Sequence, residues 1–494
     1  MSDYTYQMLA IILYFVGMIL IGLIGFRRTK NLDDYMLGGR RLSPLVSAMS
    51  AGASDMSQWL LMGLPGALYV AGLVEIWMPI GLAAGTWLNW KIVAPRLRTY
   101  SQVANNSITV PSFLDNRFKN DATLLRIVSG LIILLYFTFY VSSGMVAGGV
   151  FFQEAFDFSY HTGLMIVGGV TILYTFIGGF LAVSYTDVVQ GTMMFLALIL
   201  VPIFSLFATG GFGDMAASAI EVNPDAFNMF STATVLGTIS LLAWGVGYFG
   251  QPHIIIRFMA IRSAEETKQA RRIGFGWVVL SLGGAVATGL VGSAYFQQNP
   301  DLTLNDPEAV FLVLGQILFH PFIAGLMLAA VLAAIMSTVS SQLLVSSSAL
   351  VEDIYKVILK KKRSDSYYVS MGRVGVLLIS AVAIYFAWEQ NDTILGLVAF
   401  AWAGFGASFG PIILLSLYWK KFTSAGALWG MIVGAVTVFI WGNSALSDYL
   451  YEIVPGFVFA LLVAFVVSEV TYKPNPEVEE EFDEAVRLAK QTKE

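Results

Sequence analysis

The sequence predicts an all-α polytopic membrane protein with about 13 transmembrane helices. Of its 494 residues, 57% are hydrophobic and only 12% are charged, and the mean hydropathy is +0.72. Soluble domains carry about 25% charged residues, so this chain lacks the charge to cover a surface in water. Apolar segments of about 20 residues, the length of a bilayer crossing, also recur along the whole chain. These observations exclude a soluble enzyme, a nucleic-acid binder and a disordered scaffold.

Thirteen segments are long and apolar enough to cross a bilayer. They are 7–26, 44–72, 73–93, 124–152, 161–183, 186–208, 230–257, 274–296, 321–350, 367–388, 393–418, 425–443 and 453–472. Basic residues follow the first segment rather than precede it, which indicates a membrane helix and not a cleaved signal peptide. The shorter run from Val310 to Leu318 predicts an interfacial or re-entrant helix on the outer side.

The distribution of basic residues predicts the orientation of the chain. With the N-terminus outside, six inner segments contain all 28 Lys and Arg residues, as the positive-inside rule requires. These segments are 27–41, 91–126, 257–272, 356–373, 420–421 and 473–493. We therefore expect one transmembrane domain over residues 1–472 and a cytoplasmic tail over 473–494. The tail begins with prolines and then favours a short helix, most simply a solvated end that fixes the topology.

The second and seventh spans are interrupted by Gly and Pro. Span two contains Gly63, Pro65 and Gly66, and span seven contains Gly250 and Pro252. Close packing through small residues explains either stretch alone, but the two spans lie five apart and run in opposite directions. Such pairs indicate an inverted repeat and point to the binding site of a secondary transporter. The repeats would cover about 44–208 and 230–418, and no phosphate-binding GxxxxGK[ST] loop is present, so a gradient must supply the energy.

Asp55 is the only carboxylate that we place deep inside a span. A charge at mid-membrane costs roughly 2.5–3.5 kcal/mol even on the most lenient scale, so Asp55 needs a cation, a proton or strong hydrogen-bond donors. It lies in the interrupted segment beside Ala53, Met56 and Ser57, where freed carbonyl oxygens suit a hard cation. A neutral, structural Asp55 is the alternative.

Span nine carries a second set of oxygen atoms. Ser337 and Thr338 lie three and four residues after Ala334, so they share its helical face. Their hydroxyls and the Ala334 carbonyl predict the other half of a sodium site, although such hydroxyls often bond only to their own helix. The absence of cysteine and the presence of only three histidines argue against a transition-metal cluster.

Aromatic residues predict a solute pocket. Trp244, Tyr248 and Pro252 recur at four-residue intervals, on one face of an α-helix, and Tyr140 lies in span four. They can sandwich a small apolar ligand, or simply fill the core. Arg40 and Asp187 lie near cytoplasmic span ends, where they either form an inner gate or set the topology.

Six motifs resemble the sodium/solute symporter family, and in particular its bacterial proline-transporting members. They are LGGR at 37–40, SAGASDMSQWLLMGLPGA at 50–67, YTFIGGFLAVSYTDVVQ at 174–190, WGVGYFGQPH at 244–253, LAAIMSTVSSQLL at 332–344 and AWAGFGASFGP at 401–411. The resemblance covers residues 10 to 470 and implies a LeuT-type five-plus-five core with extra helices.

The resemblance also implies roles for individual residues. The Na+ site would use backbone oxygens of Ala53, Met56 and Ala334 and the hydroxyls of Ser337 and Thr338, with Asp55 in support. The proline pocket would involve Ser57, Tyr140, Trp244, Tyr248 and Pro252, with Gln58 where the proline symporters carry Gly. Arg40 and Asp187 match functionally important positions of the family.

The resulting hypothesis is a sodium-coupled symporter that imports L-proline across a bacterial inner membrane by alternating access. No enzymatic activity, nucleic-acid partner or obligate protein partner is expected. The alternatives are symport of another small solute, proton coupling through Asp55, and a solute-binding membrane sensor or channel.

Overall fold

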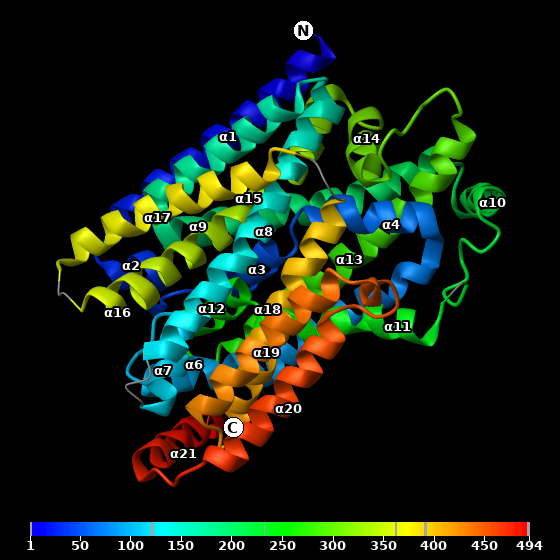
Figure 1. The fold of residues 1–494 in the computed structure, drawn as a ribbon. Coiled ribbons are helices and arrows are strands. Elements are labelled where there is room, and N and C mark those ends of the chain that lie inside the picture. The colour runs from blue at the N-terminus through cyan, green and yellow to red at the C-terminus, as the bar shows by residue number, and fades with distance from the viewer. Residues whose placement is uncertain (1, 120–122, 232, 361–362, 390–392, 492–494) are drawn as a thin grey trace.

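The computed structural model describes residues 2–119, 123–231, 233–360, 363–389 and 393–491. These residues fold into helices without any β-strand among them, as Figure 1 shows. Within these described residues, ten helices are long and apolar enough to cross a membrane, or 11 when one bent pair counts as a span. The prediction of an all-α membrane protein is therefore confirmed, and the described residues contain ten or 11 such helices where the sequence predicts 13 spans.

The long helices are α1 (Asp3–Arg28), α8 (Thr123–Phe156), α9 (Tyr160–Ala208), α13 (Thr267–Gln298), α15 (Pro321–Ser348), α17 (Asp365–Ala387), α18 (Ile394–Tyr418), α19 (Ser424–Gly442) and α20 (Ile453–Thr471). The two interrupted regions comprise α3 (Pro44–Asp55), η2 (Trp59–Gly63) and α4 (Leu64–Ala71), and α11 (Val235–Leu242), η5 (Ala243–Gly250) and α12 (Pro252–Ala260). The segment after α4 consists of η3 (Gly72–Ile76), α5 (Trp77–Leu88), η4 (Asn89–Val93) and α6 (Ala94–Val103). Shorter elements are α2 (Leu32–Leu37), η1 (Gly38–Arg40), α7 (Val110–Phe118), α10 (Phe212–Val222), η6 (Pro307–Ala309), α14 (Val310–Ile317), η7 (Ala349–Tyr355), α16 (Lys356–Leu359), η8 (Ala445–Asp448) and α21 (Pro476–Gln491).

Helix α9 illustrates why helices and predicted spans are not equal in number. Its 49 residues would extend about 74 Å if straight, more than twice the hydrocarbon core. Gly179 lies inside it with φ 64° and ψ −160°, a conformation that only glycine adopts without strain. The helix therefore changes direction there, within the predicted span 161–183 and shortly before the predicted boundary to the span 186–208.

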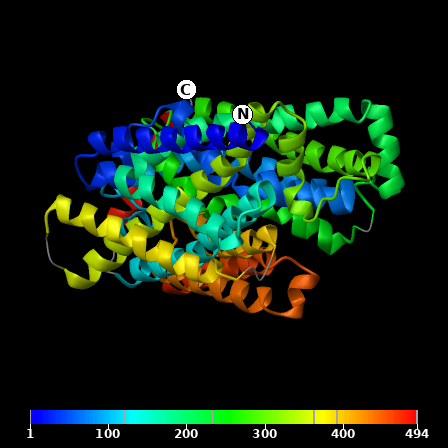
Figure 2. The ribbon, with the colours of Figure 1, turned by 90° about the horizontal axis from the view of Figure 1, so that it is seen from above.

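Helix α15 forms the centre of the bundle. It packs against α1, α3, α8, α9 and α17, and nearly every residue from Ala324 to Ser348 is buried. Alanine and serine dominate this stretch, and small side chains let neighbouring helices approach closely. Helices α1 and α20 lie on opposite sides of the bundle (Figure 2).

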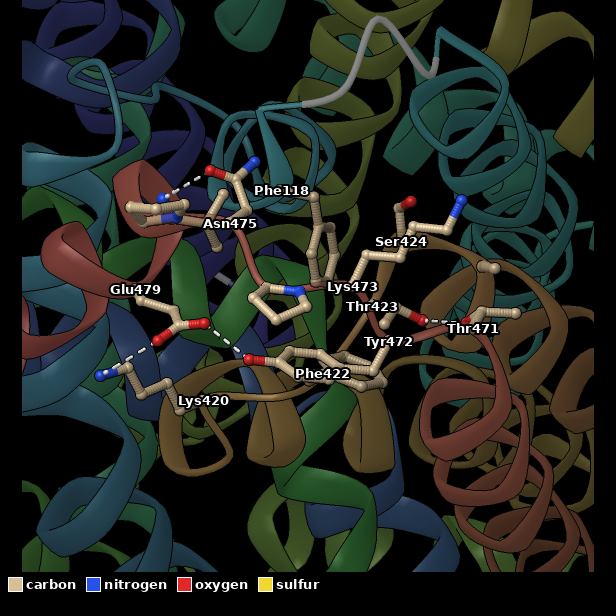
Figure 3. A pocket seen from close by; sticks show the side chains of 14 residues that line it. Phe118, Lys420, Phe422, Thr423, Ser424, Thr471, Tyr472, Lys473, Asn475 and Glu479 are labelled. Carbon is tan, nitrogen blue, oxygen red and sulfur yellow. Dashed lines mark hydrogen bonds and ion pairs between the residues drawn. The ribbon is translucent and has the colours of Figure 1, made fainter.

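The C-terminal helix α21 is docked rather than free. Lys119 contacts Glu477 at 2.5 Å and Glu481 at 2.6 Å, and Phe482 packs edge-on against Tyr100 with ring centroids 6.1 Å apart. A cavity of about 370 Å³ separates α21 from the ends of α19 and α20 (Figure 3). The tail thus forms the predicted helix, but it packs against α6 and α7 instead of extending into solvent.

We expect Gly179→Ala to lower the stability of the folded protein. A Cβ atom at this position would come within 2.6 Å of the Tyr35 ring and would sit on a backbone with positive φ, a strain of order 1–3 kcal/mol. The matched control is Gly169→Ala in the same helix, where a Cβ meets nothing within 4 Å. Thermal unfolding in detergent measures both, and equal midpoints for the two variants would contradict the assignment of a strained turn.

Candidate functional site

Helix α3 is interrupted in the middle of the molecule. It ends at Asp55, and Met56 adopts non-helical angles of φ −74° and ψ 74°. The amide of Ser57 donates to the Asp55 carbonyl at 2.8 Å and not to the Ala53 carbonyl, its partner in a continuous α-helix. The Ala53 oxygen is therefore free to accept from another helix.

The hydroxyls of α15 approach this freed carbonyl. Ser337 Oγ lies 2.7 Å from the Ala53 oxygen and 3.2 Å from the Ala334 oxygen, and Thr338 Oγ1 lies 3.5 Å from the Ala53 oxygen. All four residues are buried. Four of the five predicted sodium ligands thus converge, whereas the Met56 carbonyl makes no hydrogen bond to this group within the described part of the chain.

The carboxylate of Asp55 belongs to a different environment. Its Oδ2 atom accepts a 2.5 Å hydrogen bond from the Tyr248 hydroxyl. Asp55 and Ala53 are two residues apart, so their side chains point about 200° apart around the helix. Within the described residues, the Asp55 side chain forms no hydrogen bond with Ala334, Ser337 or Thr338.

The second interruption joins η5 to α12. The helix from Val235 to Gly250 bends by 44° relative to Pro252–Ala260, and Gln251 between them is extended. Residues 243–250 form a 3₁₀-helix with three residues per turn. The expectation that Trp244, Tyr248 and Pro252 share one α-helical face is therefore wrong, because four-residue spacing no longer aligns side chains.

Aromatic rings surround the two interruptions. The Trp244 ring lies 6.4 Å from Trp59, 6.2 Å from Trp402 and 5.4 Å from Tyr451, and the Trp402 indole donates to the Trp244 carbonyl at 2.9 Å. Trp402 also packs edge-on against Tyr248 at 5.1 Å. Sequence reasoning missed Trp59 and Trp402, although both lie inside motifs that resembled the family.

Two hydroxyls near these rings lack a hydrogen-bond partner within the described residues. Tyr140 and Ser57 are buried, and neither hydroxyl forms a hydrogen bond of normal geometry, although Tyr140 lies close to Ser57 and Trp59. The side chain of Gln58 is held by α8, since Nε2 donates to Ser143 Oγ at 2.8 Å. Ser143 in turn donates to the Tyr140 carbonyl at 2.6 Å, so Gln58 and Tyr140 are neighbours.

Pro252 does not face this group in the contacts that the structure describes. It begins α12 and lines a separate cavity of about 10 Å³ together with Thr109, Val345 and Asp353. Its contribution at this position is to end the extended linkage at Gln251, since proline suits the first turn of a helix.

A buried ion pair connects α9 and α12. Arg257 Nη2 lies 3.3 Å from Asp187 Oδ2, and both side chains are fully buried. Ser50 of α3 donates to the same carboxylate at 2.6 Å, and Arg257 donates to Ser341 of α15 at 2.7 Å. The pair thus joins four elements, and sequence reasoning predicted Asp187 but counted Arg257 only as a basic residue of an inner segment.

Arg40 takes part in another network. It adopts a left-handed backbone with φ 52°, and it donates to the carbonyls of Ser107 and Met259 at 2.7 Å each. Burial and the neighbouring Arg98 guanidinium lower the pKa of Arg40 to about 10, so it stays charged at neutral pH. Arg40 and Asp187 form no ion pair with each other within the described residues. Each contacts α12, Arg40 through the Met259 carbonyl and Asp187 through Arg257.

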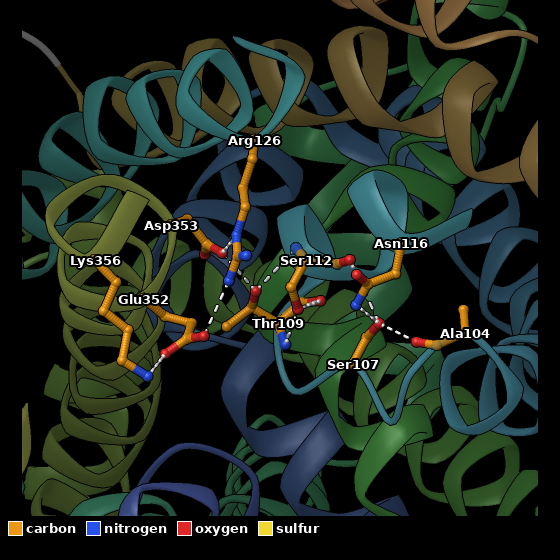
Figure 4. Close-up of polar contacts among 9 residues, drawn as sticks. All are labelled: Ala104, Ser107, Thr109, Ser112, Asn116, Arg126, Glu352, Asp353 and Lys356. Carbon is orange, nitrogen blue, oxygen red and sulfur yellow. Dashed lines mark hydrogen bonds and ion pairs between the residues drawn. The ribbon is translucent and has the colours of Figure 1, made fainter. Parts of the chain in front are cut away.

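Beside Arg40, a further polar network fixes the segment between α6 and α8 (Figure 4). Arg126 contacts Glu352 and Asp353 at 2.9 Å each, and Thr109 donates to Asp353 at 2.9 Å. Helices α7, α8 and η7 are thereby connected through charged side chains.

The model of the sodium:solute symporter family matches residues 35–434. The chain belongs to this family. Its members are transporters, not enzymes. Sodium and a solute are thus the species that this chain transports.

Individual relatives extend the comparison with the symporter family. The chain is 60% identical over 467 residues to the high-affinity proline transporter PutP of Bacillus subtilis (strain 168), covering 94% of this chain and 98% of that protein. It is 49% identical over 488 residues to the sodium/proline symporter of Escherichia coli (strain K12), covering 98% and 97%.

Solved structures support the same fold. A Na+-coupled sialic acid symporter in a substrate-bound outward-open state matches with a TM-score of 0.82 at 21% identity, covering 95% of this chain and 98% of that chain. A nucleobase-cation-symport-1 family transporter in a closed conformation matches with a TM-score of 0.57 at 15% identity, covering 91% and 98%.

We expect the Asp187–Arg257 pair of this symporter to behave as one unit. Asp187→Asn or Arg257→Gln alone leaves one charge buried without its partner, which destabilises the protein by about 3–5 kcal/mol. The double variant should lose less than the sum of the two single losses. Arg262→Gln, which removes an exposed pair with Glu266, serves as control with an effect under about 1 kcal/mol. Unfolding in detergent provides these free energies, and strictly additive losses would contradict the coupling.

Proposed function

We propose that this protein is a secondary active transporter that couples the entry of Na+ to the uptake of L-proline. The observation that carries the proposal is the Ala53 carbonyl, which is freed by the interruption of α3 and faces Ser337 and Thr338 of α15. The names of the curated relatives, a high-affinity proline transporter and a sodium/proline symporter, support the choice of solute.

The sodium ion would replace hydrogen bonds that now hold the two helices together. Ser337 donates to the Ala53 carbonyl, and rotation of its hydroxyl turns a lone pair toward a cation between them. Carbonyl and hydroxyl oxygens are the ligands that a hard cation prefers. Met56 completes the proposed set from the non-helical turn. Sodium would thereby fix the distance between α3 and α15.

Proline would bind between the aromatic rings and the two hydroxyls without partners. Its pyrrolidine ring suits contact with the rings of Trp244 and Tyr248, and its carboxylate suits the donors of Ser57 and Tyr140. Buried polar groups without partners cost about 1–3 kcal/mol each, so a solute that satisfies these hydroxyls gains affinity. Gln58 would border this pocket with an amide oxygen that has no partner within the described residues.

Asp187 and Arg257 would close the cytoplasmic side, with Arg40 holding the end of α12. One Na+ moving through a 100 mV potential and down a tenfold gradient supplies about 3.7 kcal/mol. That energy sustains a solute ratio of several hundred, on the order of 10² to 10³.

The proposal includes 13 spans with an inverted repeat, an outer N-terminus and a cytoplasmic C-terminus in a bacterial inner membrane. The turn at Gly179 supports two spans within α9. The predicted inner segments also contact one another: Arg40 binds Ser107 and Met259, and Lys119 binds Glu477. Helices α2, α6, α7, α16 and α21 lie together at the end opposite the N-terminus (Figure 1).

Uptake of labelled proline into proteoliposomes tests the function. An inward Na+ gradient at equal pH on both sides should drive accumulation above the external concentration. Replacing Na+ by K+ should abolish it. Accumulation that follows a proton gradient without Na+ would indicate proton coupling, and equilibration without accumulation would indicate a channel or sensor.

Ser337→Ala should raise the Na+ concentration for half-maximal uptake by about tenfold or more, because one oxygen ligand is lost. A tenfold change in affinity corresponds to about 1.4 kcal/mol. The matched control is Ser348→Ala in the same helix, since among the described residues the Ser348 hydroxyl bonds only to the Leu344 carbonyl, at 2.9 Å. Sodium titrations of initial uptake rates compare the two. A Ser337→Ala variant with the sodium dependence of the control would reject the proposed ligand.

A further inference from the structure

Helix α21 carries an apolar stripe with a row of acidic residues on each side. The buried residues of the stripe recur at helical intervals and are Val478, Phe482, Ala485 and Ala489. Glu477 and Glu481 are four residues apart and form the first row. Glu479 and Asp483 form the second row, about 200° away around the helix. The helix can therefore form ion pairs on both sides while its stripe faces the protein.

Two lysines from different parts of the chain contact these rows. Lys119, which follows α7, lies 2.5 Å and 2.6 Å from the two carboxylates of the first row. Lys420, in the connection between α18 and α19, lies 2.7 Å from Asp483 and 3.6 Å from Glu479 of the second row. Figure 3 shows Lys420 beside Glu479. Helix α21 is thus held between α7 and the connection from α18 to α19.

These ion pairs lie at the surface of the molecule. The side chains of Glu477 and Asp483 are 72% and 64% exposed. Exposed ion pairs contribute modest stability, and dissolved salt screens them. The strength with which Lys119 and Lys420 hold α21 therefore falls as the ionic strength of the surrounding solution rises.

The docked helix also covers a charged group that lacks partners. Arg117 is buried, and its guanidinium lies over the rings of Tyr100 and Phe482 at 5.2 Å and 5.3 Å. Its Nε atom donates to the Ser416 carbonyl at 3.2 Å, but Nη1 and Nη2 have no hydrogen-bond partner within the described residues. Burial of such a group is unfavourable. This cost offsets part of the gain from packing Phe482, so docking depends on the exposed ion pairs as well.

Helix α6 connects α21 to the end of α12. Tyr100 of α6 packs edge-on against Phe482, with ring centroids 6.1 Å apart. The neighbouring Arg98 donates to the carbonyls of Ile261 and Arg262 at 2.5 Å and 2.8 Å. These two residues directly follow α12. Helix α21 therefore packs on the element that holds the cytoplasmic end of the second interrupted region.

We propose that α21 is a salt-sensitive restraint that slows the opening of the cytoplasmic side of the transporter. While docked, it joins α6 and α7 to the connection between α18 and α19, so ion pairs on one side of α21 must break before the end of α12 moves away from α18. A rise in cytoplasmic ionic strength screens these pairs, releases α21 and raises the turnover rate. The linker 472–475 is not helical and keeps the released helix tethered. The inference rests on the function and topology proposed above and adds a regulation to them.

The first measurement follows the position of α21 in the purified full-length protein. The sequence contains no cysteine, so spin labels on Glu265→Cys and Glu480→Cys attach nowhere else. Both positions are exposed, one after α12 and the other on α21. Raising KCl from about 0.1 M to about 1 M shortens the screening length from about 10 Å to about 3 Å. We expect the distances between the labels to become longer and more broadly distributed at the higher concentration.

The second measurement is sodium-driven proline uptake into proteoliposomes at saturating Na+, with the same KCl concentration on both sides. The wild type should take up proline about threefold faster, or more, at about 1 M KCl than at about 0.1 M. The double variant Lys119→Gln, Lys420→Gln lacks both contacts to the acidic rows and should be fast at either concentration. Arg487→Gln is the matched control, since Arg487 pairs with Glu484 inside α21, and it should keep the salt dependence of the wild type.

Label distances that stay unchanged at high KCl would overturn the release of α21. A released helix without faster uptake, or a folded double variant no faster than the wild type at low KCl, would overturn its effect on turnover. A wild type without sodium-driven uptake would instead overturn the proposed function, while the label distances would still decide whether salt releases α21. Thermal unfolding in detergent identifies a double variant that fails to fold, and the salt dependence of the wild type and its label distances then decide.

Discussion

The hydrogen bond between Tyr248 and Asp55 joins the two interrupted segments of the molecule. Asp55 is the last helical residue of α3, and Tyr248 lies in η5, three residues before the extended Gln251. Each interruption frees backbone groups that water cannot reach, so each must find a partner within the protein. The bond between these residues holds the two interruptions together, with Tyr248 and the aromatic rings on the Asp55 side of α3 and the Ala53 carbonyl facing the hydroxyls of α15 on another side.

The surrounding helices maintain this arrangement. Helix α15 supplies hydroxyls to the Ala53 carbonyl, and α18 supplies Trp402, whose indole and carbonyl bind the second interruption from both sides. The second interruption depends on these contacts, because the 3₁₀-helix of η5 has poorer hydrogen-bond geometry than an α-helix. The large, rigid ring of Trp402 fixes the distance between η5 and α18 in a way that a flexible side chain would not.

Much of the fold and of the candidate site could be predicted from the sequence. Hydropathy predicted the membrane class, and Gly250 and Pro252 flank the break of the second interruption at Gln251. In the first interruption the turn is at Met56, whereas Gly63, Pro65 and Gly66 lie in the helical segments that follow it. The convergence of Ala53, Ala334, Ser337 and Thr338 followed from helical spacing and from the family resemblance. Spacing failed for Trp244, Tyr248 and Pro252, because it assumes 3.6 residues per turn and η5 has three.

The interaction partners of the predicted residues were harder to infer from the sequence. Arg257 pairs with Asp187 across 70 residues of sequence, and no local pattern separates it from the basic residues of the inner loops. The significance of Arg257 comes only from the side chains that the fold places around it, and that is a property of three-dimensional packing rather than of spacing.

The burial of Arg257 has a consequence for the kinetics of the transport cycle. Its guanidinium contacts Ser50, Asp187 and Ser341 on three different helices. If Arg257 separated only partly from Asp187, one charge would stay in a medium of low polarity while the other began to hydrate. That intermediate is higher in energy than either the intact pair or the two fully hydrated charges. In the proposed transport cycle this closure would therefore open as a single cooperative event, with water entering along both charges together. A transporter built in this way would spend little time half open, which would limit the leak of ions down their gradient between productive turnovers.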